Sequence, residues 1–230
     1  MGAIISQAEG GPALGDLAET APMHRIEGRN ATKADVLFYE IDGARVAVKT
    51  YAPRGFFIRH TLGRWLIRRE ARAYEEGSGV DGLPAFLGRQ GSFALATEWV
   101  DAEPLSSHRD EALDPEIFDR LAGILDELHG RGVALADLHH RDVLLSANGD
   151  LYVIDLATAW VLGKRPWPFR RLLFERFCES DLVNLARMRA RFTGGDAEAA
   201  VASVSPAAAA WHRRGRRVKG LLDRLRGKRR

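Results

Sequence analysis

The most informative part of the sequence is Ala136-Asp137-Leu138-His139-His140-Arg141-Asp142-Val143-Leu144-Leu145, followed by Leu151-Tyr152-Val153-Ile154-Asp155. Between the two apolar runs stands Ser146-Ala147-Asn148-Gly149-Asp150. Asn-Gly between apolar runs is a strong hairpin signal, because both residues tolerate the positive φ of a tight turn. A hairpin would bring Asp142 and Asp155 to the same end of two paired strands, with Asp137 on the loop that enters them. Carboxylates that converge in this way need a cation or a proton to share.

The composition is that of a globular protein with a sizeable core. The 230 residues are 46% hydrophobic and 28% charged, which suits one domain or two small lobes. The lone Cys178 cannot form an intrachain disulfide, so we interpret it as a buried small hydrophobe. No apolar run reaches the roughly 18 to 20 residues of a membrane span. Residues 1–21 also lack the pattern of a signal peptide.

Charge is distributed unevenly along the chain. The formal net charge is +3, but residues 211–230 hold ten Lys or Arg and one acid, which leaves 24 basic and 30 acidic residues elsewhere. Apolar residues repeat at helical spacing within this basic tail: Val218, Leu221, Leu222 and Leu225. A basic segment with an apolar face favours an anionic membrane surface. A solvated tail is the alternative, and nucleic acid is the least favoured partner.

Periodicity and turn signals divide the chain into four parts. We expect a flexible N-terminal arm (1–22), an N-lobe with an antiparallel sheet and one helix (23–100), a C-lobe (101–193), and an Ala-rich, then basic tail (194–230). The expected N-lobe strands lie within 24–26, 36–41, 44–51, 83–88 and 93–100, and its helix spans 56–74. The C-lobe begins with a linker at 101–104. Its helices are expected after the cap and proline at Asp114-Pro115 and over 171–192.

Several motifs occur in the order typical of the protein kinase-like superfamily. Val46-Ala47-Val48-Lys49 resembles the third-strand Val-Ala-Ile-Lys, and residues 69–75 resemble the helix that bears the glutamate partner of that lysine. Asp137 and Asp142 have the spacing of the catalytic Asp and the metal-binding Asn, and Asp155 stands at the position of the Asp in Asp-Phe-Gly. The resemblance covers about residues 23–190. It is strongest to bacterial lipopolysaccharide-core (Kdo and heptose) kinases and to RIO-like atypical kinases. Asp137-Leu138-His139 resembles the Asp-Leu-His of these kinases, and residues 28–36 resemble the RIO nucleotide loop more than a Gly-x-Gly-x-x-Gly loop.

This resemblance implies a two-lobed, α+β protein kinase-like fold, with a small antiparallel-sheet N-lobe and a short, mainly helical C-lobe. It implies that Lys49 provides a fixed positive charge for the phosphates of ATP and that Glu70 orients it through an ion pair, although Glu75 or Glu76 could be the partner. The remaining nucleotide contacts that it implies are Gly28, Thr32 and Lys33 at the phosphates, and Glu98 and Val100 at the adenine.

The resemblance also implies the catalytic and metal-binding roles of the three acids. Asp137 would accept the proton of the attacking hydroxyl, while Asp142 and Asp155 would supply the hard oxygen ligands that Mg²⁺ prefers. Read on their own, the same acids could be turn and capping residues, and Lys49 could be a solvated charge. The adjacent His139 and His140 do not form a metal site by spacing, and we interpret His139 as structural.

Departures from the family pattern bear on the acceptor. Leu135-Ala136 stands where His-Arg usually precedes the catalytic Asp, Asp142 replaces Asn, and Leu156-Ala157 replaces Phe-Gly. No Ala-Pro-Glu segment follows. Without that peptide-docking segment, a sugar or lipid-linked hydroxyl is favoured over a protein.

The sequence therefore predicts an ATP- and Mg²⁺-dependent kinase. By resemblance, its acceptor is a lipopolysaccharide inner-core sugar. We expect a cytoplasmic protein that can lie peripherally at the inner face of the inner membrane through its basic tail. A RIO-like serine/threonine kinase and a nucleotide-binding pseudokinase are the alternatives.

Overall fold

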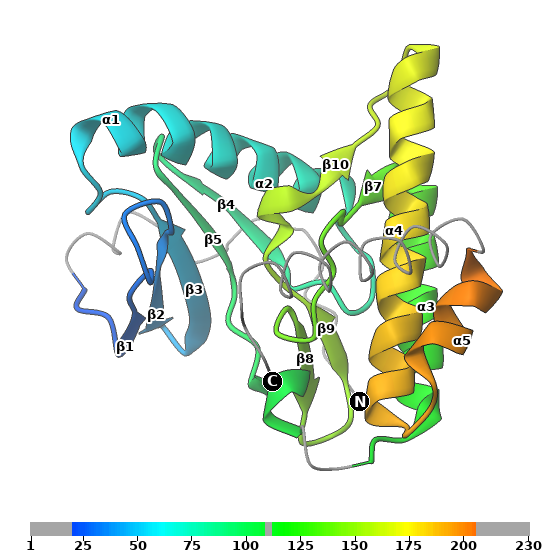
Figure 1. Ribbon diagram of the computed structural model, residues 1–230. Helices are drawn as coiled ribbons and strands as arrows, with labels where there is room; N and C mark the ends of the chain where they lie inside the picture. Colours follow the sequence, from blue (N-terminus) through cyan, green and yellow to red (C-terminus); the bar gives the residue numbers. More distant parts are fainter. Residues whose placement is uncertain (1–19, 109–111, 206–230) are drawn as a thin grey trace, which may run out of the picture. The chain divides into compact units, whose positions relative to one another are not determined.

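The computed structural model describes residues 20–108 and 112–205, which divide into two compact units (Figure 1). The first unit holds the described residues up to Gly79 together with Leu83–Asp101 and Asp155–Thr158. The second holds Val80–Gly82, Ala102–Ile154 and the described residues from Ala159 onward. An α+β structure with an antiparallel sheet is confirmed. The predicted basic tail (211–230) and most of the N-terminal arm lie outside the described residues.

The first unit is built on a five-stranded antiparallel sheet in the order β1-β2-β3-β5-β4. Its strands are β1 (His24–Ile26), β2 (Asp35–Ile41), β3 (Ala44–Thr50), β4 (Phe86–Gln90) and β5 (Ala94–Glu98). Asp42 and Gly43 join β2 to β3 with φ of 52° and 79°. Two consecutive positive φ values define the type I′ turn that matches the twist of a hairpin. The five predicted strands are therefore present, with shifted ends.

A helical segment follows β3 and packs against β4 and β5 (Figure 1). It consists of α1 (Phe56–Ile58), a π-helical turn (Arg59–Gly63) and α2 (Arg64–Glu76). Ile67 is fully buried against Tyr51 and Leu95. Gly63 allows the close approach, because a Cβ placed on it would lie 2.8 Å from the Cβ of Tyr51. This packing fixes the face of α2 that carries Glu70.

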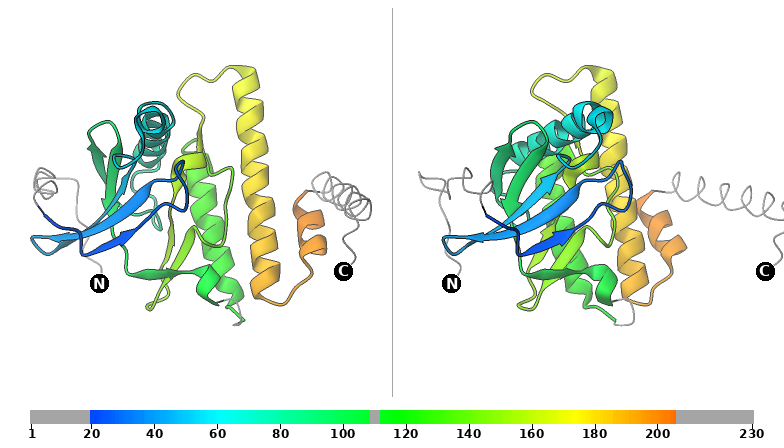
Figure 2. Two further views of the ribbon diagram at one scale, coloured as in Figure 1. Left: turned by 60° about the vertical axis from the view of Figure 1, so that its left-hand side comes forward. Right: turned by 90° about the vertical axis from the view of Figure 1, so that its left-hand side faces the viewer.

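Three helices form the frame of the second unit: α3 (Pro115–Gly130), α4 (Pro168–Phe192) and α5 (Ala197–Val204). Asp114 caps α3 by accepting a hydrogen bond from the Glu116 amide at 2.9 Å, and proline occupies the first helical position, as predicted. Both views in Figure 2 show α5 beside the C-terminal part of α4. Part of the Ala-rich stretch, which was predicted to belong to the tail, is thus a helix that buries Val201.

The predicted hairpin is present in the second unit. β8 (Val143–Ser146) pairs antiparallel with β9 (Leu151–Val153), and β6 (Ala102–Pro104) pairs with the other edge of β8. The prediction of a linker at 101–104 was wrong for its last three residues, because the backbone of β6 extends the hairpin into a sheet. A separate pair joins β7 (Val133–Ala134) to β10 (Trp160–Val161).

Short 3₁₀ helices complete the described structure: η3 (Leu105–His108) in the second unit and η4 (Leu156–Thr158) in the first. Within residues 20–108 and 112–205, no helix combines the length and the apolar character needed to cross a bilayer.

Candidate active site

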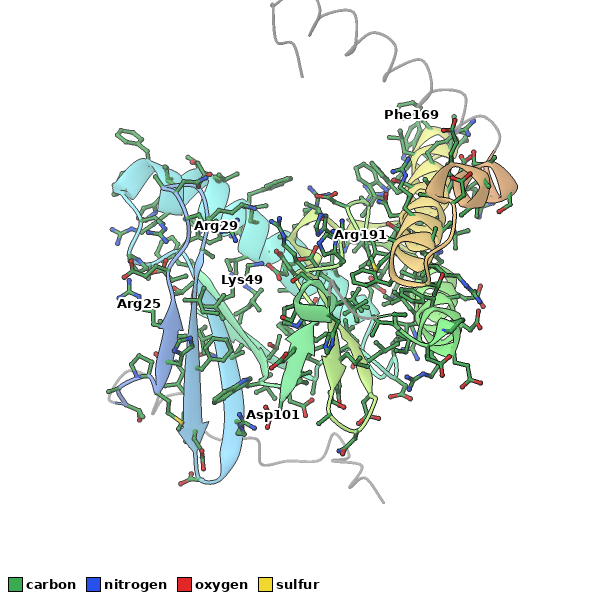
Figure 3. The ribbon with its side chains drawn as sticks, turned by 60° about the horizontal axis from the view of Figure 1, so that its bottom comes forward. Arg25, Arg29, Lys49, Asp101, Phe169 and Arg191 are labelled. Atoms are coloured by element: carbon green, nitrogen blue, oxygen red, sulfur yellow. The ribbon has the colours of Figure 1, made fainter. Side chains whose placement is uncertain are left out.

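Lys49, which is labelled in Figure 3, is the centre of a polar cluster in the first unit. Its side chain, 18% exposed, leaves β3 and places Nζ 3.0 Å from Oε1 and 2.9 Å from Oε2 of Glu70 on α2. The same Nζ lies 2.6 Å from Oδ1 of Asp155. The predicted ion pair with Glu70 is confirmed, and Asp155 also contacts Lys49 directly.

The charges in this cluster depend on one another. Burial by itself would lower the pKa of Lys49, but Glu70 and Asp155 outweigh it and raise this pKa above its ordinary value. Burial also favours the protonated form of Asp155, yet Lys49 holds the pKa of this carboxyl below its usual range. The result is a fixed ammonium charge beside an ionised carboxylate whose side chain is 45% exposed.

The backbone at Asp155 is held in an uncommon conformation. Asp155 has φ of 60°, a region that non-glycine residues rarely adopt. Its amide donates to the hydroxyl of Tyr74, its carboxylate accepts from the Ala157 amide, and Glu70 accepts from the Leu156 amide. Arg69 adds a hydrogen bond of 2.6 Å to the carbonyl oxygen of Thr158. Helix α2 therefore fixes residues 155–158, and such local strain is characteristic of functional positions.

The predicted phosphate loop is closed by internal hydrogen bonds. The Gly28 amide donates to Oδ1 of Asp35 at 2.9 Å, and a Cβ at Gly28 would lie 2.5 Å from the Lys33 carbonyl oxygen. Both the amide and the hydroxyl of Thr32 donate to the Asn30 side chain, at 3.1 Å and 2.8 Å. The positive charge of Lys33 contributes to the lowered pKa of Asp155, so the two side chains interact electrostatically within the first unit.

Asp35 is a residue of this region that the sequence analysis missed. Its side chain is fully buried and accepts hydrogen bonds from Arg25, at 2.7 Å, and from Arg54. Arg54 also donates to the Lys33 carbonyl oxygen at 2.7 Å. Burial would raise the pKa of Asp35, but the Gly28 amide and the two arginines together lower it. Asp35 thus joins both ends of the loop to the sheet. An acid directly before the apolar strand at Val36 was the only signal in the sequence.

The residues predicted to hold an adenine lie at the end of β5. The Glu98 amide donates to the Ala85 carbonyl oxygen at 2.8 Å, and its Oε2 accepts from the Ala85 amide at 3.3 Å. The Glu98 side chain therefore ties β5 to the start of β4. Val100 follows this strand and is half-buried.

Asp137 and Asp142 belong to the second unit. Asp137 is exposed and directly follows Ala136. Ala136 has φ of 67°, which is uncommon for a residue other than glycine, as is the φ of Asp155. Asp142 directly precedes β8, and its carbonyl oxygen accepts from the Ile154 amide at 2.8 Å. Asp155 directly follows Ile154 in the sequence, but it belongs to the first unit. β9 thus ends two residues before the carboxylate that binds Lys49.

A buried acid on α4 supports the loop that carries Asp137. Oδ2 of Asp181 accepts from the Leu135 amide at 2.8 Å and lies 3.0 Å from Nε2 of His129. Asp181 is fully buried. Neither side chain was predicted from the sequence to have a role. A signal was present, since Asp181 occupies an apolar position of α4 in register with Phe174 and Leu185.

The remaining candidates for chemistry are structural. Nδ1 of His139 accepts from the Arg141 amide at 3.3 Å, and the rings of His139 and His140 lie 4.0 Å apart. Burial, with Asp181 next, raises the pKa of the Cys178 thiol to about 12, so this thiol is protonated at neutral pH. In the part of the chain that the structure describes, no three His, Cys, Asp or Glu side chains form a ready-made metal site.

Comparison with known proteins gives no further assignment: no protein-family model matches the chain, and no curated protein sequence matches it.

Proposed function

We propose that this protein is an ATP- and Mg²⁺-dependent phosphotransferase with a two-lobed protein kinase-like fold. The observation that carries the proposal is the position of Lys49 between a buried glutamate and a partly exposed aspartate. A lysine held as a fixed charge suits the phosphates of a nucleotide, because phosphoryl transfer concentrates negative charge there. The ordered motifs of the sequence lead to the same function by resemblance.

The donor set fits Mg²⁺. Asp155 presents a carboxylate that stays ionised and keeps nearly half of its surface exposed, and Asp142 adds a second hard oxygen donor. Mg²⁺ is commonly bound by one or two carboxylates together with phosphate oxygens and water. When bound, the ion would neutralise charge on the phosphates.

The chain's own residues have three tasks in the proposed reaction. Lys49, oriented by Glu70, binds the nucleotide phosphates, and residues 28–35, with Thr32 and Lys33, cover them. Asp137 accepts the proton of the acceptor hydroxyl. At the same time the hydroxyl oxygen forms a bond to the γ-phosphorus, and the bond from this phosphorus to the β–γ bridging oxygen breaks. The products are a phosphate ester and ADP.

We further propose a sugar or lipid-linked hydroxyl as the acceptor, with a lipopolysaccharide inner-core sugar as the preferred class. The absence of an Ala-Pro-Glu segment after Asp155 supports this choice over a protein. In this proposal the protein acts in the cytoplasm, and its basic tail, residues 211–230, contacts the anionic inner face of the inner membrane.

Nucleotide binding is tested first. Thermal shift with ATP and Mg²⁺ is expected to raise the melting temperature of the wild type, and Asp155→Ala is expected to lose the Mg²⁺-dependent part of this shift. Asp126→Ala, an exposed substitution on α3, serves as the control. A shift that is absent, or that does not depend on Mg²⁺, contradicts the enzyme and favours a binding module.

Transfer is tested with labelled ATP and two acceptors, lipid A-core saccharide and a casein-like protein. We expect label on the saccharide, and Asp137→Ala is expected to abolish it while the thermal shift survives, because Asp137 would act on the acceptor and not on the nucleotide. Label on the protein alone would replace the sugar acceptor with a serine or threonine. Undiminished transfer by Asp137→Ala would refute its catalytic assignment.

A further inference from the structure

Large exposed apolar side chains are unevenly distributed in the structure. Among the described residues, the exposed aromatic ones are Phe56, Phe57, Trp65, Trp167 and Phe169. Three lie within residues 52–69 of the first unit and two within residues 162–174 of the second. Neither stretch contains an Asp or a Glu, although acids make up 31 of the 230 residues. Exposed aromatics in an acid-free, basic segment indicate a contact surface.

The stretch in the first unit forms the outer face of the helical segment 56–76. Phe57 is 80% exposed and Trp65 54% exposed, and Arg68 continues this face toward the C-terminus of α2. The opposite face buries Ile67 and Glu70. We call the outer residues Phe56, Phe57, Arg64, Trp65 and Arg68 the aromatic-arginine face. The aromatic-arginine face is separate from the Lys49 cluster, because Glu70 points to the other side of the helix.

The chemistry of this face matches an anionic lipid surface. Arg64 and Arg68 place positive charge on this face, and residues 52–69 contain no acid. Arg54 does not add to this charge, because it forms an ion pair with the buried Asp35. Aromatic rings gain free energy at the boundary between headgroups and acyl chains, and arginine stems reach from there to the phosphates. Because Phe57 and Trp65 are exposed on one face of the helical segment, its axis can run parallel to a bilayer.

The aromatic rings are less suited to nucleic acid. Base stacking needs an open ring face, but Phe56 lies 4.4 Å from the ring of His60 and edge-on to Phe57. The Arg69 guanidinium lies over the Trp65 ring, 5.0 Å from its centroid. The Thr61 hydroxyl donates to the Phe57 carbonyl oxygen at 2.6 Å and is therefore already engaged.

We propose that the aromatic-arginine face binds the surface of an anionic bilayer, with Phe57 and Trp65 inserted at the level of the headgroups. This inference is independent of the basic tail and of the proposed phosphotransfer. It would hold the first unit at a membrane even in a variant that transfers no phosphate.

Insertion of Trp65 is tested with the full chain and vesicles of phosphatidylglycerol and phosphatidylcholine that carry bromine on their acyl chains. Bromine quenches tryptophan emission only at short range. Trp65→Phe is expected to lose the quenched part of the emission, whereas Trp99→Phe, which removes a half-buried ring covered by Arg45, is expected to keep it. The same quenching in Trp65→Phe as in the wild type overturns the proposal, even if the tail binds the vesicles.

Charge is tested by co-sedimentation with the same lipids without bromine. Arg68→Gln is expected to weaken binding about five-fold, the factor that corresponds to about 1 kcal/mol for one arginine near an anionic surface. Arg120→Gln, an exposed arginine on α3, is the matched control and is expected to bind as the wild type does.

Two outcomes would assign the surface to something else. Quenching that disappears in Trp167→Phe but not in Trp65→Phe would place the contact on the second stretch, at the N-terminal end of α4, where Figure 3 shows Phe169. A change of Trp65 emission on addition of a single-stranded oligonucleotide, with none on addition of brominated vesicles, would assign the face to nucleic acid. Either result contradicts the membrane proposal.

Discussion

At the scale of single residues, Lys49 compensates two carboxylates that would otherwise repel each other. Glu70 is 2% exposed, and burial raises its pKa despite the nearby ammonium group. Leaving a buried carboxylate without its partner costs more free energy than the pair itself provides. Removal of Lys49 is therefore expected to affect stability as well as the proposed chemistry.

Lys49→Met is expected to lower the free energy of unfolding by about 3 kcal/mol, because Glu70 then remains buried without a counter-charge. The double variant Lys49→Met/Glu70→Gln is expected to recover part of this loss, since it also removes the buried charge. Urea denaturation measures both. Equal stability of the single variant and the wild type would show that Glu70 is solvated or protonated in the folded protein.

Asp35→Asn is expected to destabilise the protein by about 2 to 3 kcal/mol at neutral pH, because a neutral amide cannot replace the ion pairs to Arg25 and Arg54. The folded pKa of Asp35 lies below the reference value of 3.8. The ionised carboxylate therefore stabilises the fold fully above about pH 4, and this contribution is lost as the pH falls through the folded pKa.

Thermal unfolding at several pH values checks this prediction for Asp35. The difference between wild type and Asp35→Asn should be largest at neutral pH and should shrink below pH 3.8. A difference that stays constant over this range would mean that the carboxylate charge has no part in the effect.

At the scale of elements, local signals correctly predicted the structures that depend on near neighbours. The β8–β9 hairpin follows from Asn148-Gly149, and the start of α3 follows from Asp114-Pro115. Interactions with distant partners were harder to predict. β6 pairs with β8 about forty residues later, and Ala102–Pro104 carries no strand pattern that would have shown it.

Asp114→Ala is expected to lower the free energy of unfolding by about 1 kcal/mol, because the Glu116 amide loses its capping acceptor. Asp126→Ala, in the exposed part of the same helix, removes an equal charge without touching the cap, so it should change stability by less than about 0.5 kcal/mol. Chemical denaturation of the two variants provides the comparison. Indistinguishable values would show that α3 does not depend on this cap.

At the scale of the whole molecule, each unit contains a short segment that is flanked in the sequence by residues of the other unit. Val80–Gly82 belongs to the second unit although first-unit residues flank it, and Asp155–Thr158 belongs to the first unit although second-unit residues flank it. Gly82 allows Val80–Gly82 to pack closely within the second unit. Its φ is 92°, and an added Cβ would lie 2.4 Å from Cδ1 of Ile124. Neither unit is therefore a continuous piece of sequence.

A fragment of residues 20–101 is expected not to fold on its own. It would contain Lys49 and Glu70 but not Asp155, nor the Leu156 amide that donates to Glu70. Its circular dichroism should show no cooperative thermal transition, whereas the full chain, measured in parallel, should show one. A cooperative transition in the fragment at the temperature of the full chain would show that residues 155–158 are dispensable for the first unit.

The five strands of the first unit, the helical segments α2, α3 and α4 and the β8–β9 hairpin were predictable from the sequence, because repeat patterns, caps and turns act over a few residues. The pairing of Lys49 with Glu70 was predicted from the resemblance of the motifs. Only the tertiary structure decided that Asp155 packs with Lys49, 106 residues away, that Asp181 holds the loop before Asp137, and that Asp35 closes the loop at Gly28. Each of these acids is stabilised by donors brought to it by packing, and a buried carboxylate has no periodic pattern that reveals its partners.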